Sequence, residues 1–92
     1  MKTHELKILP KYFEAVLDGT KTFELRNNDR DFKVGDILIL KEYTTELITV
    51  GQYGEELKRE GGYTGREIKK EITYVLKNIV GLYKNYAILG IK

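Results

Sequence analysis

The stretch from Gly19 to Asp36 constrains the fold most strongly, because it combines a helix end, a charged strand and a tight turn directly ahead of an apolar strand. From Thr20 to Arg26 the residue types alternate, with Phe23 and Leu25 on one face and polar residues on the other. A period of two residues is typical of a half-buried strand. The stretch therefore predicts a strand with one apolar and one charged face.

The charged face carries Glu24 and Arg26, which are two residues apart and about 6.6 Å from each other along a strand. Lys21 follows the turn at Gly19 and reaches the same region from the helix end. Two cations and one carboxylate are thus expected in a compact cluster. Thr22 shares this face.

The first half of the chain predicts two further strands and a helix. Glu5 to Leu9 resembles a short strand, which Pro10 ends, and Lys11 to Asp18 fits a helix whose apolar stripe is Phe13, Val16 and Leu17. Val34-Gly35-Asp36 predicts a turn, and the run Ile37 to Leu40 predicts a core strand covered on both faces.

The second half predicts two more strands. From Ile68 onward the residues alternate between two faces, with Ile68, Lys70, Ile72, Tyr74 and Leu76 on one and Lys69, Glu71, Thr73, Val75 and Lys77 on the other. From Tyr86 to Ile91 the residues Ala87, Leu89 and Ile91 share one face. Between these strands and the first half, Thr44 to Gly62 is expected to be a mobile excursion with a short strand at Leu47 to Val50 and a helical turn or two at Gln52 to Glu60. Two interpretations of this excursion stay open: it is a lid beside a site, or it is an insertion without a role.

Together these elements predict the α+β class, as a small, mixed, mainly antiparallel β-barrel of about five or six strands with one or two short helices. Ninety-two residues suit a single domain, 1-92. The chain has no cysteine and one histidine, which excludes thiol catalysis and a histidine-based zinc site, so we expect neither a metal nor a cofactor. His4 is expected to be an exposed terminal residue, with a catalytic role as the alternative.

The N-terminal residues contain no apolar run of signal-peptide length, and no stretch approaches the length of a membrane span, so a cytoplasmic protein without a membrane partner is expected. The net charge of +2 and a pI near 8.8 permit a polyanionic partner without requiring one. The sequence leaves the oligomeric state open.

The spacing Gly19-x-Lys21-x-x-Glu24-x-Arg26 resembles the hallmark region of the ASCH domains, small members of the PUA-like superfamily. The segment from Asn27 to Asp36 and the motif Tyr63-Thr64-Gly65-Arg66 are similar to an uncharacterised bacterial and phage branch of that superfamily. The resemblance covers nearly the whole chain except roughly Thr44 to Gly62. It implies a PUA-like fold and binding of RNA, a nucleotide or a nucleoside.

With this resemblance, a pocket lined by Lys21, Glu24, Arg26 and Arg66, with Tyr63 and Tyr43 at its rim, is expected to bind the ligand. Arginine and lysine suit phosphate or base acceptors, glutamate accepts from an exocyclic amine, and tyrosine offers a stacking face. The alternative from the residues alone is that Glu24 and Arg26 pair on a strand surface, where such a pair contributes about 0 to 1 kcal/mol.

Two other functions stay open. One branch of small ASCH proteins resembles amidohydrolases acting on acylated cytidine, with a lysine that Lys21 matches and a threonine nucleophile where this chain has Glu24. A small amidohydrolase using Lys21 and Glu24 is therefore the first alternative, with Thr22 as a substitute hydroxyl. A protein-interaction domain that uses a strand edge or the excursion is the second.

Overall fold

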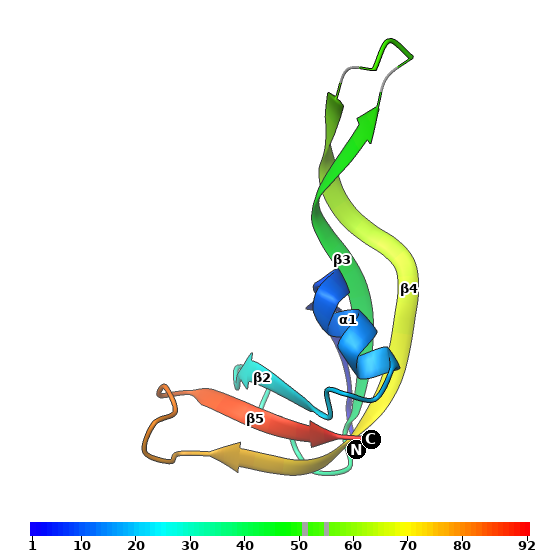
Figure 1. Ribbon diagram of the computed structural model, residues 1–92. Coiled ribbons are helices and arrows are strands. Elements are labelled where there is room, and N and C mark those ends of the chain that lie inside the picture. Colours follow the sequence, from blue (N-terminus) through cyan, green and yellow to red (C-terminus); the bar gives the residue numbers. More distant parts are fainter. Residues whose placement is uncertain (51, 55) are drawn as a thin grey trace.

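The computed structural model describes residues 1–50, 52–54 and 56–92 (Figure 1). Five strands and one helix are found in these residues. In chain order they are β1 (Thr3–Ile8), α1 (Pro10–Leu17), β2 (Phe23–Asn27), β3 (Ile37–Val50), β4 (Glu56–Lys77) and β5 (Tyr86–Ile91). The predicted elements at Glu5 to Leu9, Lys11 to Asp18 and Tyr86 to Ile91 are confirmed within a few residues.

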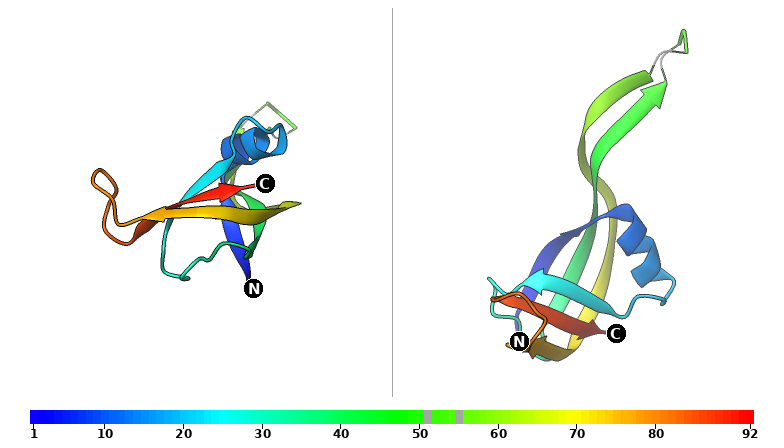
Figure 2. Two further views of the ribbon diagram at one scale, coloured as in Figure 1. Left: turned by 90° about the horizontal axis from the view of Figure 1, so that it is seen from below. Right: turned by 60° about the vertical axis from the view of Figure 1, so that its left-hand side comes forward.

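The strands form one mixed sheet in the order β1-β3-β4-β5-β2. β1 is parallel to β3, and the other pairs are antiparallel. The long strand β4 belongs to both halves of the sheet, because its first part pairs with β3 and its last part with β5 (Figure 2). The sheet curls, but β1 and β2 remain its two edges and the described strands do not close into a barrel. The coarser prediction, a small α+β fold with a mainly antiparallel sheet, is confirmed.

The core lies on the concave face of this sheet. Leu38 and Leu40 of β3 and Ile72 of β4 are completely buried, and Phe13 and Val16 of α1 pack into the same cluster. The helix begins at Pro10, whose fixed φ suits a first turn. It is followed by Gly19 at φ +87°, a left-handed conformation that glycine adopts without a Cβ clash. Leu17, predicted to join the apolar stripe, is instead half exposed.

The parts of β3 and β4 that lie between Thr44 and Gly62 extend as a two-stranded ribbon away from the body, and the molecule measures 53 × 25 × 23 Å. The predicted strand at Leu47 to Val50 is confirmed as part of β3. The predicted helical turns at Gln52 to Glu60 are wrong for the described residues, because 52–54 form a turn and 56–60 belong to β4. Residues 51 and 55 of that prediction lie outside the described residues.

An irregularity in β4 breaks the alternation predicted from Ile68 to Leu76. The register with β5 shifts between Ile72 and Tyr74, which inserts an extra residue. A bulge of this kind reverses which residues face the core. Ile72 is therefore buried and Tyr74 is 63% exposed, whereas Val75, predicted to face outward, packs against the core.

Candidate functional site

A strand with one apolar and one charged face is expected to bury the apolar face, but β2 buries its charged face. Phe23 and Leu25 are 47% and 52% exposed, whereas Glu24 between them is only 3% exposed. A buried carboxylate is costly unless cations and hydrogen-bond donors surround it. The charged face of β2 therefore points into the fold because its charges compensate each other.

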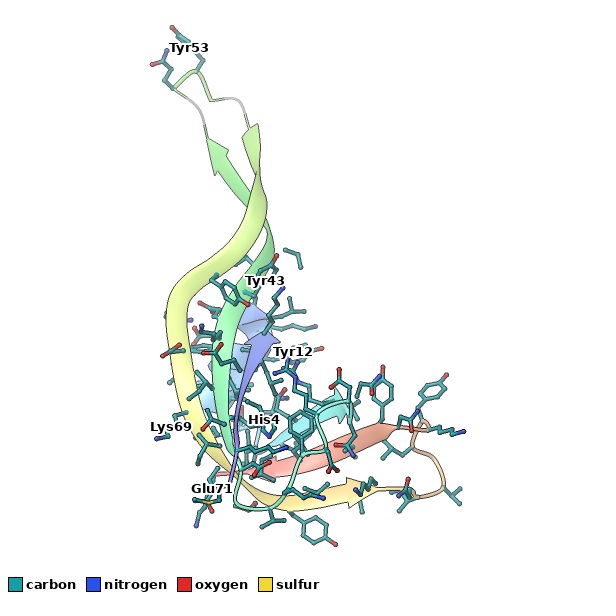
Figure 3. All side chains as sticks on the ribbon, turned by 180° about the vertical axis from the view of Figure 1, so that it is seen from behind. His4, Tyr12, Tyr43, Tyr53, Lys69 and Glu71 are labelled. Atoms are coloured by element: carbon teal, nitrogen blue, oxygen red, sulfur yellow. The ribbon has the colours of Figure 1, made fainter. Side chains whose placement is uncertain are left out.

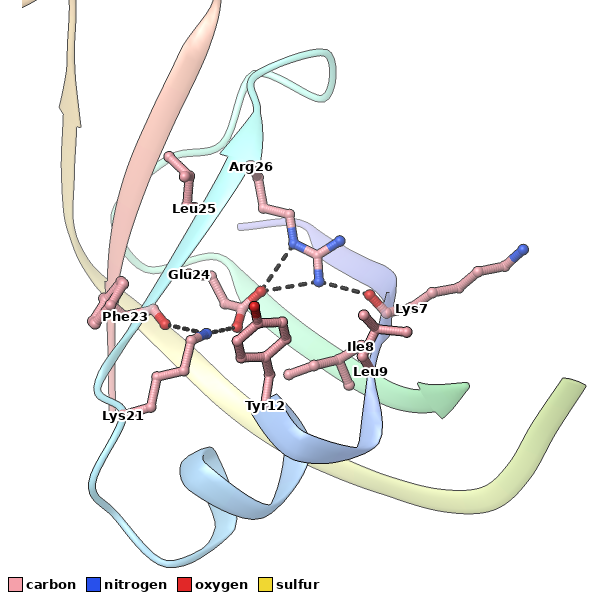
Figure 4. Close-up of a pocket in the computed structure, with 9 residues that line it drawn as sticks. All are labelled: Lys7, Ile8, Leu9, Tyr12, Lys21, Phe23, Glu24, Leu25 and Arg26. Carbon is pink, nitrogen blue, oxygen red and sulfur yellow. Dashed lines mark hydrogen bonds and ion pairs between the residues drawn. The ribbon is translucent and has the colours of Figure 1, made fainter. Parts of the chain in front are cut away.

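Glu24 joins the two cations in the cluster that the sequence predicts, which we call the β2 charge cluster (Lys21, Glu24 and Arg26). The Nε and Nη2 atoms of Arg26 each lie 2.9 Å from Glu24 Oε2. Lys21 Nζ donates to Glu24 Oε1 and, at 2.8 Å, to the carbonyl oxygen of Phe23 (Figure 4). The interpretation as a strand-surface pair is wrong, because Glu24 lies inside and both of its oxygens are bound.

Arginine side chains also connect the two open edges of the sheet. Arg26 Nη2 donates to the carbonyl oxygen of Lys7 in β1 at 2.7 Å, and Arg30 Nη1 donates to that of Glu5 at the same distance. These carbonyl groups belong to the edge of β1 that has no neighbouring strand. Two guanidinium groups thus take the place of strand pairing across the gap between β1 and β2.

A pocket of about 440 Å³ occupies this gap. The β2 charge cluster lines it together with Tyr12 of α1 and apolar groups of β1 and β2 (Figure 4). Lys21 Nζ lies 5.6 Å from the ring centre of Tyr12 and 5.1 Å from that of Phe23, so two aromatic rings flank the ammonium group. The remaining lining residues are Lys7, Ile8, Leu9 and Leu25. The volume falls in the range of small-ligand sites.

Tyr12 and Phe23 were not among the predicted site residues. The ring of Tyr12 stands in front of the Glu24 carboxylate in Figure 4. Only the position of α1 against the sheet brings it there, so no local spacing indicates it. The exposure of Phe23 follows from the reversed orientation of β2.

Arg66 was predicted to line the pocket, but it is not among the lining residues. Its Nε and Nη2 atoms donate to the two oxygens of Glu42 at 3.0 and 2.9 Å, and Nη2 also contacts Glu14 of α1. The guanidinium lies 4.7 Å from the ring centre of Phe13. Arg66 therefore fastens the helix to β3 and β4.

The contacts of Arg66 also shift the pKa values of Glu42 and of Arg66 itself. Hydrogen bonds from Arg66 and from Thr64 lower the pKa of Glu42, and hydrogen bonds to Glu42 and Glu14 raise the pKa of Arg66. Glu42 is buried in this network.

Tyr63 was predicted at the rim of the pocket and lies elsewhere. It packs edge-to-face on Tyr43 with ring centres 5.3 Å apart. Lys7 Nζ lies 4.5 Å from the Tyr43 ring and Lys41 Nζ lies 5.4 Å from the Tyr63 ring. Lys7 extends away from the pocket in Figure 4, so this aromatic group belongs to a separate surface.

His4, predicted to be exposed, is buried (Figure 3). Its Nε2 donates to Asp36 Oδ2 at 2.8 Å, and Asp36 also accepts the backbone N–H groups of Lys2 and Lys33. The hydrogen bond from His4 is the main reason that the pKa of Asp36 falls to about 2. His4 does not line the pocket. Its hydrogen bond to Asp36 joins β1 to the turn before β3.

None of the described helices has the length and apolar character needed to cross a membrane. A protein of Escherichia phage P2, named "Uncharacterized 12.9 kDa protein in GpA 3'region", is 38% identical over 74 residues. The match covers 80% of this chain and 54% of the phage protein, so the chain spans about half the length of that relative. A family model described as a domain of unknown function, DUF3850, matches residues 3–91. The chain therefore belongs to the DUF3850 family.

Proposed function

We propose that the protein is an RNA- or nucleotide-binding module whose ligand enters the pocket between β1 and β2. One observation carries this proposal: a buried carboxylate holds two cations at the floor of a pocket whose walls are largely aromatic and aliphatic. Apolar walls with a few convergent polar groups are characteristic of small-ligand sites.

The walls supply the affinity for a flat ring. Tyr12 and Phe23 are 42% and 47% exposed, so both rings have accessible surface at the pocket. Stacking of one base on an aromatic side chain is worth about 1 to 3 kcal/mol. A nucleobase uses both the aromatic surface and the polar floor, which an aliphatic ligand does not.

The floor supplies orientation and charge. Lys21 and Arg26 outnumber Glu24, so the β2 charge cluster carries one net positive charge. Phosphate and base carbonyl oxygens are acceptors that arginine and lysine bind well. A carboxylate would by itself repel an anionic ligand. In this cluster Glu24 holds both cations in place and is offset by them.

The relationship to ASCH domains and to the PUA-like barrel is part of the same proposal. It is supported by the curled five-stranded sheet and by the convergence of Lys21, Glu24 and Arg26 in one pocket.

A hydrolase of acylated nucleosides is the second candidate, favoured by the direct contact of Lys21 with Glu24. No serine or threonine is among the described residues that line the pocket, so the acyl group would have to be attacked by water. Turnover of acetylated cytidine, monitored by release of acetate, tests this candidate.

The test of binding is an NMR titration of ¹⁵N-labelled protein with a panel of nucleoside monophosphates and short single-stranded RNA. We expect shifts centred on Lys21, Glu24 and Arg26, and weaker binding as salt rises, because phosphate contacts release counterions. Arg26→Gln should reduce affinity, whereas Lys69→Gln, a charge loss at an exposed position of β4, should leave it unchanged. A panel that shifts no pocket resonance would refute the proposal.

A further inference from the structure

A smaller pocket shares Arg26 with the pocket between β1 and β2. Its volume is about 150 Å³, well below the roughly 300 Å³ at which sites for whole small molecules begin. The buried side chains of Leu6 and Phe32 contribute to its lining, and Arg30 lines it together with Arg26. A space of this size suits a small charged group that is attached to a larger ligand.

The guanidinium groups of Arg26 and Arg30 are both held by β1. Arg26 Nη2 donates at 2.7 Å to the carbonyl oxygen of Lys7. Arg30 Nη1 donates at the same distance to the carbonyl oxygen of Glu5. Both contacts lie at the exposed edge of the sheet, where water would satisfy the carbonyl groups equally well. What these hydrogen bonds add is a fixed position for each guanidinium group.

The two arginines keep N–H groups that no described residue uses. A guanidinium has five N–H bonds. Arg26 uses Nε and Nη2, whereas its Nη1, the nitrogen without a dashed line in Figure 4, points away from Glu24. Arg30 uses a single N–H bond, on Nη1, and has no carboxylate partner within the described residues. Arg30 is therefore a cation that is held in position without a counter-ion in the described part of the chain.

The spacing of the pair suits one phosphoryl group. Carbonyl oxygens two residues apart on a strand are separated by about 6.6 Å. Charge-assisted hydrogen bonds from arginine to phosphate are about 2.8 Å long, so one phosphoryl group can accept from two guanidinium groups at such a spacing. The planar fork of arginine also matches the geometry of phosphate oxygens.

We propose that Arg26 and Arg30 form a phosphate subsite in the smaller pocket, next to a nucleoside bound in the pocket between β1 and β2. This inference rests on the proposed function, because it assigns the phosphate of the same ligand to a place beyond Arg26. The carboxylate of Asp29, an exposed residue, also lines the smaller pocket and opposes an anion there. Because exposed charges interact weakly, the two guanidinium groups outweigh it.

The experiment uses isothermal titration calorimetry to compare each ribonucleoside with its 5′- and 3′-monophosphates. For the nucleoside that binds most tightly, we expect one of the two monophosphates to bind about ten-fold more tightly, because hydrogen bonds between charged groups contribute on that order. A dinucleoside monophosphate distinguishes the source of the phosphate. A gain with this ligand supports the subsite and identifies an RNA strand, whereas a gain with the terminal phosphates alone supports it and identifies a free nucleotide.

Variants test the subsite from the protein side. Arg30→Gln should remove the gain from the phosphate and leave the affinity for the nucleoside unchanged. Lys33→Gln is the matched control, because the side chain of Lys33 is a cation of the same loop, is 65% exposed and lines neither pocket. The gain should persist in this control. Asp29→Asn should increase the gain, because it removes the opposing carboxylate.

A measurement on the wild-type protein keeps the inference testable if Arg30→Gln is unstable. The NMR signals of the arginine Nε–H groups report on ligands bound to each guanidinium. The signal of Arg30 should shift when the monophosphate binds and stay in place when the nucleoside binds.

The outcomes separate the two proposals. Equal affinity for the nucleoside and both monophosphates would overturn the phosphate subsite and leave the nucleoside pocket standing. A gain that survives Arg30→Gln, or that Lys33→Gln abolishes equally, would do the same. Failure of nucleosides, nucleotides and RNA to bind would overturn both.

Discussion

Substituting Glu24 by glutamine tests whether the β2 charge cluster is a compensated interior group. The change keeps the size of the side chain and one carbonyl oxygen but removes the charge that faces Lys21 and Arg26. In the structure the side chain of Glu24 is 4% exposed, while those of Lys21 and Arg26 are 16% and 24% exposed. The variant therefore leaves two largely buried cations without their counter-ion.

The expected loss follows from that burial. Breaking a fully buried ion pair costs about 3 to 5 kcal/mol, and an exposed pair is worth about 0 to 1 kcal/mol. The cations retain some contact with water, and glutamine still accepts one hydrogen bond. We therefore expect Glu24→Gln to lower the free energy of unfolding by about 2 kcal/mol.

Urea denaturation followed by circular dichroism measures this loss, with Glu67→Gln as the control because Glu67 is an exposed glutamate of β4. The control should stay within about 0.5 kcal/mol of wild type. Since the chain has no tryptophan, the far-ultraviolet signal of the sheet is the better probe.

A double-mutant cycle identifies the cause of the loss. Lys21→Met should be less destabilising in the Glu24→Gln background than in wild type, because the lysine has already lost its partner. Groups in direct contact couple by about 0.5 to 3 kcal/mol, whereas independent sites are additive within about 0.5 kcal/mol. Additive effects of the two substitutions, or a Glu24→Gln loss no larger than the control, would refute the account of the cluster.

Three further predictions concern the scaffold. His4 lowers the pKa of Asp36 from 3.8 to about 2, so the charged carboxylate stabilises the fold above pH 4, and this stabilisation is lost as the pH falls from 4 to 2. Urea titrations at several pH values should show that Asp36→Asn removes this pH-dependent stabilisation. Arg66→Gln should lower the thermal midpoint without changing nucleotide affinity in calorimetry, because Arg66 holds α1 and does not line the pocket. Gly61→Ala should destabilise the protein in thermal unfolding, because a Cβ there would overlap the Thr44 backbone across the β3–β4 ribbon.

The sequence predicts the elements and their apolar faces well wherever residues close together in the chain are sufficient to determine them. The inward positions of β5, Ala87, Leu89 and Ile91, are all buried as predicted. Gly35 has a φ of +93° in the turn where the sequence places it. These features depend on neighbours a few residues apart, which local periodicity and turn chemistry report directly.

The errors arise where contacts between distant residues decide the outcome. His4 is buried because of Asp36, 32 positions later, and Arg66 is drawn to Glu42 and Glu14 at separations of 24 and 52 positions. No spacing rule relates such residues. The shift in β4 after Ile72 is equally invisible, since a single inserted residue leaves the alternation of the sequence unchanged while reversing the faces.

Strand β2 shows how a charge cluster can be predicted from sequence while the orientation of its strand is misjudged. Alternation separates Phe23 and Leu25 from Glu24 and Arg26, but it does not say which face is inside. Hydrophobicity alone would bury the phenylalanine and leucine, and the structure does the reverse because Lys21 and Arg26 offset the charge of Glu24. The cost of that arrangement is hard to explain by stability, since an apolar residue at position 24 would be cheaper to bury. A buried charge cluster beside exposed aromatic rings is what the proposed binding site requires, with the polar edge of a ligand at the cluster and its ring at Tyr12 and Phe23.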